Sequence, residues 1–120
     1  MFHIAKNGII TVNRGDTFTL PIFVNLGTPL EPEIFDLREG DQVIFRIVRA
    51  NDSFENAIIE KVCTIEDLNE EGSLNINFET EDTSWIEPNL YYYEVKLEYL
   101  REDKFNVKTF IPRTKFYIVD

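Results

Sequence analysis

Short stretches in which hydrophobic and polar residues alternate make up most of the chain. Alternation with a period of two is typical of a β-strand with one buried face. In the longest stretch, residues 91–99, three tyrosines share one face with Val95 and Leu97, and we expect this face to belong to the core. No stretch carries the 3.6-residue period over the length that a packed helix needs.

Seven or eight such stretches are separated by turn-forming residues. Short strands at this spacing are typical of an antiparallel sandwich or a small barrel. We therefore predict an all-β chain that folds as a single β-sandwich domain over residues 1–120. The expected strands cover residues 8–12, 17–25, 42–49, 58–62, 74–78, 91–99, 105–111 and 116–119.

The segments between the expected strands differ in character. Residues 27–40 predict a long irregular connection, and residues 66–72 predict either one helical turn or a plain loop. Pro112-Arg113-Thr114 predicts a turn between the last two strands. Because proline has no N–H to give to a neighbouring strand, Pro21 places its strand at a sheet edge or at a break in the pairing.

Composition supports the all-β prediction, and the net charge limits the classes of partner that the chain can bind. Three alanines stand against fourteen isoleucines and sixteen aromatic residues, which favours β structure further. The chain has 22 acidic and 12 basic residues and a formal net charge of −10. Such a chain repels phosphate backbones and anionic lipid heads, so we expect no nucleic-acid partner and no membrane. No apolar run approaches the ~20 residues that span a bilayer.

The charges are also unevenly placed. Residues 62–95 hold nine acids and no lysine or arginine; a solvated acidic surface is favoured, with a calcium site as the alternative. Residues 101–115 hold five bases against two acids. Head-to-tail docking of these two flanks would give a homo-oligomer, and the alternative is ordinary scatter of charge.

Side chains that carry catalysis are scarce. The chain has one histidine, His3, and one cysteine, Cys63, which removes most metal sites, Cys–His nucleophiles and internal disulfides. We find no Ser-His-Asp set and no phosphate-binding glycine loop. We therefore expect no enzyme, cofactor or metal. No secretory signal is visible at the N-terminus, which predicts synthesis in a cytoplasm.

Three stretches together carry a family resemblance: residues 14–22 with Arg14-Gly15-Asp16-Thr17, residues 37–45 with Gly40-Asp41, and residues 81–95 with Asp82-Thr83 and Tyr91-Tyr92-Tyr93. Their order resembles the immunoglobulin-like sandwich at the start of phage baseplate upper proteins and in small stand-alone phage virion proteins. The chain departs from the family in having Asn89 and Leu90, not glycine, before the tyrosines, and in ending at Asp120.

The resemblance implies a single immunoglobulin-like antiparallel β-sandwich and a bacteriophage structural protein of the virion, made in the host bacterial cytoplasm. The length fits a small accessory or decoration subunit of head, tail or baseplate. Its partners would be other phage structural subunits of capsid, tail or baseplate, and it would work by protein–protein binding. The alternative is a carbohydrate-binding adhesion module on the particle surface.

The same motifs have roles in folding. Gly15 and Gly40 precede strands at positions where a positive φ suits glycine, and the aspartate after each can accept backbone N–H groups. Tyr91, after Asp82-Thr83, predicts a tyrosine corner, in which the phenol bonds back to upstream backbone.

Three residues are candidates for binding. Phe23 points away from the core face of its strand, beside the Pro21 edge and the long connection, and it would contact a partner subunit. Trp85 and Tyr92 are the aromatic residues expected to be exposed, and they would serve a sugar-binding platform.

Overall fold

The computed structural model describes residues 2–28 and 30–120. Strands dominate, so the all-β prediction is confirmed, and the helices are single turns. Within the described residues, none of the helices is long and apolar enough to cross a membrane. The elements are β1 Phe2–Ile4, β2 Ile10–Asn13, β3 Phe18–Ile22, β4 Gln42–Arg49, the 3₁₀ turn η1 Phe54–Asn56, β5 Ile59–Cys63, the 3₁₀ turn η2 Ile65–Asp67, β6 Leu74–Phe78, α1 Thr80–Thr83, β7 Asn89–Arg101 and β8 Lys104–Val119.

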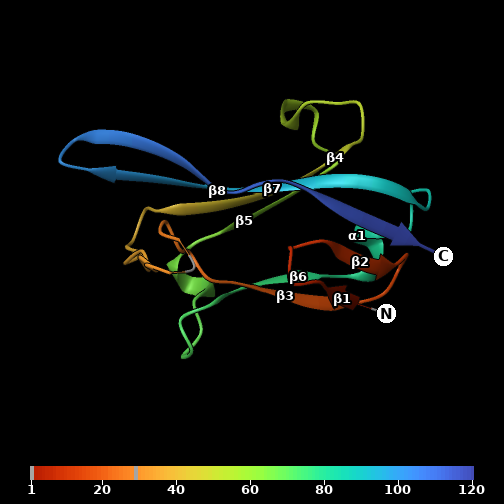
Figure 1. Cartoon of the computed structure of the whole chain (residues 1–120), viewed down its shortest axis with the longest axis horizontal. Coiled ribbons are helices and arrows are strands. Elements are labelled where there is room, and N and C mark those ends of the chain that lie inside the picture. Colours follow the sequence, from red (N-terminus) through yellow and green to blue (C-terminus); the bar gives the residue numbers. More distant parts are fainter. Residues whose placement is uncertain (1, 29) are drawn as a thin grey trace.

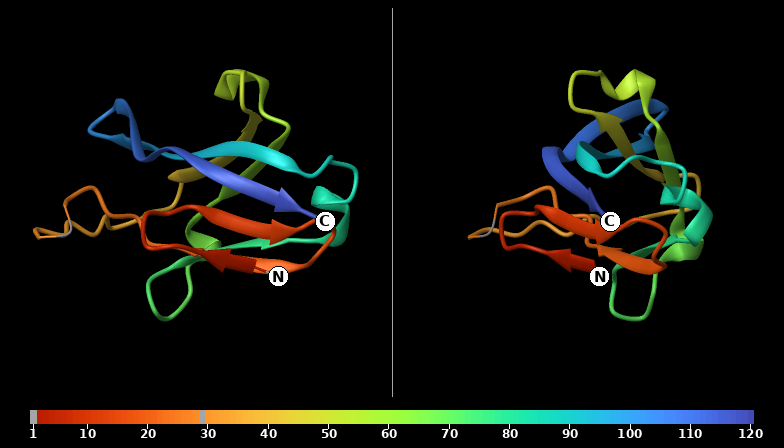
Figure 2. Two further views of the ribbon diagram at one scale, coloured as in Figure 1. Left: turned by 45° about the vertical axis from the view of Figure 1, so that its right-hand side comes forward. Right: turned by 90° about the vertical axis from the view of Figure 1, so that its right-hand side faces the viewer.

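The strands form two sheets, drawn in Figure 1. The larger sheet has the order β1-β2-β8-β7-β4-β5, and the smaller one pairs β3 with β6. The larger sheet curls, so that its β1–β2 end lies beside β3 (Figures 1 and 2). The rings of Phe2 and Phe18 stack across this junction, with centroids 4.7 Å apart.

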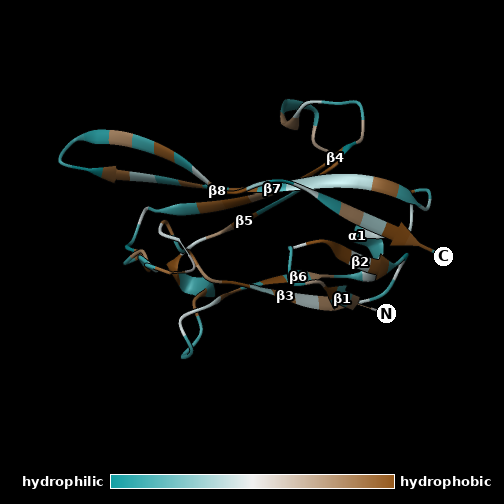
Figure 3. Ribbon diagram, in the orientation of Figure 1, coloured by the Kyte–Doolittle hydropathy of each residue, from teal (hydrophilic) through white to brown (hydrophobic). Residues whose placement is uncertain are grey.

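The core lies between the two sheets. Phe45 of β4 stacks on Tyr93 of β7 with centroids 5.3 Å apart, and meets Phe78 of β6 edge-on at 5.7 Å. The alternation predicted for residues 91–99 is confirmed, because Tyr91, Tyr93, Val95 and Leu97 are buried and Tyr99 is partly buried. In Figure 3, brown and teal bands alternate along the hairpin part of β7 and β8, whereas the right-hand part of β7 is mostly pale.

Two features of the N-terminal strands differ from the prediction. Residues Phe2–Ile4, which the pattern did not mark as a strand, pair antiparallel with β2. In turn β2 runs parallel to β8, so the larger sheet is mixed and not purely antiparallel. Parallel neighbours need a long connection between them, and here nearly the whole chain separates the two strands. No local pattern in the sequence could have indicated this pairing.

The turn predicted at residues 112–114 is wrong, because β8 continues through it as one strand of 16 residues. The register with β7 shifts here: Tyr93 faces Thr114, whereas Val95 faces Ile111. Pro112 therefore lies in a β-bulge, where its missing N–H does not break a regular ladder. A bulge within one continuous strand therefore takes the place of the predicted turn.

The predicted turn chemistry is present where it can be checked. Gly15 and Gly40 have φ of +82° and +93°. The Asp41 carboxylate accepts the Arg38 backbone N–H at 2.8 Å. Tyr91 donates its phenol to the Glu87 carbonyl at 2.6 Å, which confirms a bond back to upstream backbone. The acidic stretch from residue 66 begins inside η2 and continues as a loop.

Candidate functional site

Three segments project from one end of the molecule, on the left of Figure 1. We call this end the projecting end and define it as residues 23–28 and 30–41 (the 23–41 connection), residues 64–73 and the hairpin 99–108, which turns at Glu102-Asp103. Register pairs place these segments together, because the strand ends that border them face one another: Ile22 with Leu74, Val43 with Cys63, and Gln42 with Glu98. Figure 2 shows the hairpin and the 23–41 connection extending past the body of the sheets.

Exposed hydrophobic side chains concentrate on the projecting end. Of the eleven large hydrophobic residues that are exposed in the described part of the chain, eight lie there. Leu30 is 94% exposed and Phe105 is 63% exposed. Isolated apolar residues are normal on a protein surface, so their gathering at one end makes the projecting end a candidate interaction surface. The eight are Phe23, Leu30, Ile34, Ile65, Leu68, Leu100, Phe105 and Val107.

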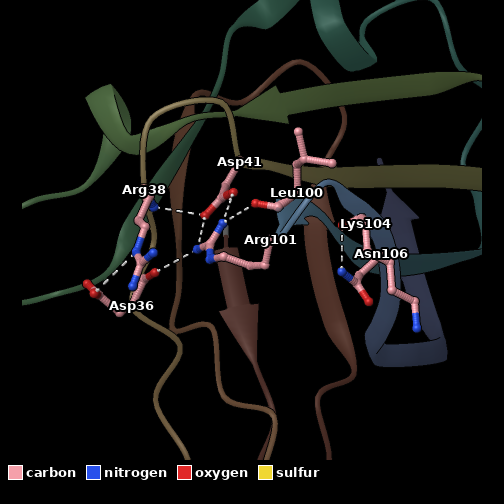
Figure 4. A network of polar contacts seen from close by, with 7 residues as sticks. All are labelled: Asp36, Arg38, Asp41, Leu100, Arg101, Lys104 and Asn106. Carbon is pink, nitrogen blue, oxygen red and sulfur yellow. Dashed lines mark hydrogen bonds and ion pairs between the residues drawn. The ribbon is translucent and has the colours of Figure 1, made fainter.

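An ion pair ties the hairpin to the start of β4 (Figure 4). Arg101 donates from Nη1 to Asp41 Oδ1 at 2.9 Å and from Nη2 to Asp41 Oδ2 at 2.8 Å. The Asp41 side chain is only 2% exposed. Burial raises the pKa of this carboxyl, but the hydrogen bonds from Arg101 and the Arg38 N–H outweigh it, so the net shift is downward. Asp41 is therefore ionised when the domain is folded near neutral pH.

The same arginine also holds the 23–41 connection. Its guanidinium lies 5.2 Å from the ring centroid of Phe35 and 5.4 Å from that of Tyr99. The two rings meet each other at 4.8 Å. Arg101 Nη2 further approaches the Asp36 carbonyl at 3.3 Å. One side chain thus joins the hairpin, the connection and β4.

Local hydrogen bonds fix the shape of the connection beyond this anchor. Asn25 Oδ1 accepts the backbone N–H groups of Gly27 and Glu33, both at 2.9 Å. A Cβ on Gly27 would collide with the Glu31 carbonyl oxygen and lie 2.7 Å from the Glu33 nitrogen. The connection is accordingly a closed loop with Leu30 near its tip, although the sequence predicted only an irregular segment.

A groove of about 510 Å³ separates the connection from the hairpin. Its walls are Asn25, Leu26, Gly27 and Glu33 on one side and Tyr99, Lys108, Thr109 and Phe110 on the other. A second, smaller groove of about 180 Å³ is more apolar and lies where β1 and β3 meet without pairing. Ile4, Pro21 and Phe23 are among its walls.

The three binding residues predicted from the sequence do not form one site. Phe23 is 52% exposed and belongs to the projecting end. Trp85 is 58% exposed but follows α1 at the opposite end, beside Arg49. Tyr92 is half-buried, because the guanidinium of Arg113 lies 4.4 Å from its ring centroid. The rings of Trp85 and Tyr92, both described by the structure, make no contact with each other, and the sugar-binding role of these residues stays a prediction.

Sequence reasoning missed the apolar hairpin. The feature that produces it is visible only in the structure: β7 has 13 residues and β8 has 16, whereas the pattern predicted separate strands over residues 91–99, 105–111 and 116–119. Both strands are far longer than the usual five or six residues. Strands of that length must extend past the neighbours they pack on. The sequence placed Phe105 and Val107 in a strand, but it did not reveal that no sheet covers them.

The remaining chemistry is sparse. Within the described residues, no three His, Cys, Asp or Glu side chains are grouped so as to hold a metal ion, including the acidic stretch considered for calcium. Burial raises the pKa of Cys63 to about 11, which keeps the thiol protonated. No family model matches the chain, and neither a curated protein nor a solved structure resembles it at a significant level.

Proposed function

We propose that this chain is a bacteriophage structural subunit with an immunoglobulin-like fold, a small accessory protein of head, tail or baseplate, and that it binds other virion subunits through its projecting end. The sequence resemblance supplies the phage assignment. The exposed hydrophobic side chains of the projecting end support binding to another protein. The observation that carries the proposal is the group of eight exposed hydrophobic side chains at the projecting end, six of them on the connection and the hairpin that Arg101 and Asp41 join.

The strand arrangement supports the immunoglobulin-like part. In such domains one sheet contains strands C′, C, F and G, and the other contains B and E. Here the order β5-β4-β7-β8 faces the pair β3-β6. The corner tyrosine of these domains stands two residues before a buried position on strand F. Tyr91 and Tyr93 have this spacing on β7, and Phe45 of β4 packs against Tyr93.

Binding through loops at one end of a sandwich also suits the physical properties of this one. A partner that buries Leu30 or Phe105 gains free energy from apolar area removed from water. Because the loop backbones are already fixed by hydrogen bonds, ordering them costs little on binding. The functional consequence is a rigid adaptor surface and not a catalytic site.

The test is incorporation into particles. Density-purified, washed particles from a lysate that contains the protein are analysed by quantitative mass spectrometry, and we expect a fixed copy number per particle. Phe105→Ser should lower that copy number, whereas Trp85→Ser, a similarly exposed aromatic at the other end, should leave it unchanged. Abundance in the lysate with absence from washed particles would refute the virion assignment.

A second function, carbohydrate binding, is favoured by one observation. Trp85 is exposed beside an open hollow of about 340 Å³ whose walls include Arg49 and Glu87. An exposed indole next to charged and polar groups suits a sugar ring, which presents an apolar face and hydroxyl edges. Binding on a glycan array that Trp85→Ala abolishes, together with normal incorporation of Phe105→Ser, would favour this function over protein binding.

A further inference from the structure

The projecting end carries most of the net charge of the protein. Its three segments contain eleven acidic residues and four basic ones, a difference of seven out of the total of −10. Within the described part of the chain, only Asp36 and Asp41 among these acids form ion pairs, with Arg38 and Arg101. The others leave an excess of unpaired carboxylates around the exposed hydrophobic side chains.

This combination specifies a partner more narrowly than hydrophobicity alone. A partner that covers the projecting end must contact exposed apolar side chains that are surrounded by negatively charged carboxylates. Complementary charge accelerates encounter and fixes orientation, whereas an acidic surface meets repulsion. The partner should therefore present lysine or arginine side chains around an apolar centre.

A second copy of this chain fits that description poorly. Two projecting ends repel each other. The basic residues of β8 are a weak substitute, because Arg113 already donates to the Ala50 and Asp52 carbonyls and lies over Tyr92. Head-to-tail docking of the flanks would have to draw on the remaining lysines.

We infer that the projecting end docks a basic, amphipathic segment of another protein, with leucine- or phenylalanine-type side chains in contact with Leu30, Leu100 and Phe105 and cationic side chains against the carboxylates of residues 31–39 and 66–71. The inference rests on the proposed protein-binding function and adds the chemistry of the partner. It does not depend on the phage assignment.

The probe is a 14-residue peptide of lysine and leucine, with a control peptide in which glutamate replaces every lysine. Each is titrated into the uniformly ¹⁵N-labelled full chain and followed by amide chemical shifts. We expect the lysine peptide to shift signals of residues 23–41, 64–73 and 99–108, and the glutamate peptide to shift none. The affinity should fall at least about tenfold between low and high salt, as the shortening Debye length screens the field.

Matched charge variants separate a site from bulk charge. Glu70→Lys with Glu71→Lys changes two exposed carboxylates at the projecting end, and Glu55→Lys with Glu81→Lys changes two exposed carboxylates at the opposite end. Both pairs of substitutions alter the net charge equally. We expect the first pair to weaken peptide binding at least about fivefold and the second to change it less than about twofold.

Several outcomes overturn the inference. Equal weakening by the two double variants would mean that the peptide senses only total charge. Shifts centred near Trp85, or equal binding of both peptides, would place the site elsewhere or remove the charge requirement. Concentration-dependent shifts at the projecting end without peptide would make a second copy the occupant. Loss of Phe105→Ser from particles while Glu70→Lys with Glu71→Lys is incorporated normally would reject the basic partner but keep the proposed function.

Discussion

Replacing Arg101 should destabilise the domain more than any other single charged substitution that we consider. In Arg101→Met the Asp41 carboxylate loses two charge-assisted hydrogen bonds and keeps only the Arg38 N–H. Because the Arg101 guanidinium is accessible to solvent, the loss arises at the Asp41 carboxylate, whose side chain is buried. Leaving a buried acceptor short of its hydrogen-bond partners costs about 1–3 kcal/mol. Two cation–π contacts, to Phe35 and Tyr99, are lost at the same time.

Urea unfolding followed by circular dichroism measures this loss. For a domain with a stability of about 5–15 kcal/mol, the variant remains folded, and its midpoint should fall by about 1 M or more. Arg101→Lys keeps the charge but not the two-pronged geometry, so it should recover only part of the stability. Hydrogen exchange should accelerate in residues 25–40, because the anchor of the connection is gone.

The decisive control is a double-mutant cycle with Asp41→Asn. If the two side chains stabilise each other, the double variant should lose clearly less than the sum of the single losses, with a coupling energy of about 1.5 kcal/mol or more. A coupling near zero, or a loss below about 1 kcal/mol in Arg101→Met, would show that water satisfies Asp41 equally well. The assignment of this pair as the anchor of the projecting end would then be wrong.

Three further outcomes follow from individual groups. Tyr91→Phe removes the bond to the Glu87 carbonyl and should cost about 1 kcal/mol in urea unfolding, with no change of fold by circular dichroism. Cys63 is buried and its pKa is raised to about 11, so a thiol reagent at mildly alkaline pH should label it only as fast as the domain unfolds. Burial raises the pKa values of Asp41 and Asp82, but their hydrogen bonds and ion pairs lower these pKa values overall. The stability that the two carboxylates provide is therefore complete above about pH 4 and is lost as the pH falls through their lowered folded-state pKa values. Thermal melts across that pH range should show this loss as a falling melting temperature.

Much of the core could be predicted from the sequence because it depends on local pattern. The period of two assigns each side chain of β4 and β7 to a face, and a one-residue error would have exposed the whole set. Phe45, Tyr93 and Leu97 are buried as the alternation required. The turn glycines and the bond of Tyr91 followed equally from local backbone geometry, which needs no knowledge of distant segments.

The projecting end could not be predicted in this way, because long-range pairing creates it. The alternation in the hairpin is as regular as in the core, but whether a neighbouring sheet covers a strand depends on where β3 and β6 end. Likewise, the contact between Arg101 and Asp41 joins residues 60 positions apart. The sequence predicted Phe23 as a contact residue by its position opposite the core face, and it could not show that Leu30 and Phe105 lie at the same end.

The placement of polar and apolar groups at the projecting end argues for binding and against a defect of folding. Evolution could have removed an exposed leucine or phenylalanine at little structural cost, since Leu30 and Phe105 contribute almost nothing to the core. The opposite holds for the residues that support these loops. Hydrogen bonds of Asn25, Asp41 and Arg101 fix the loop backbone, and the close packing around Gly27 leaves no room for a side chain. A surface loop with no partner needs neither a fixed backbone nor apolar tips. Their combination is what a preformed docking surface requires.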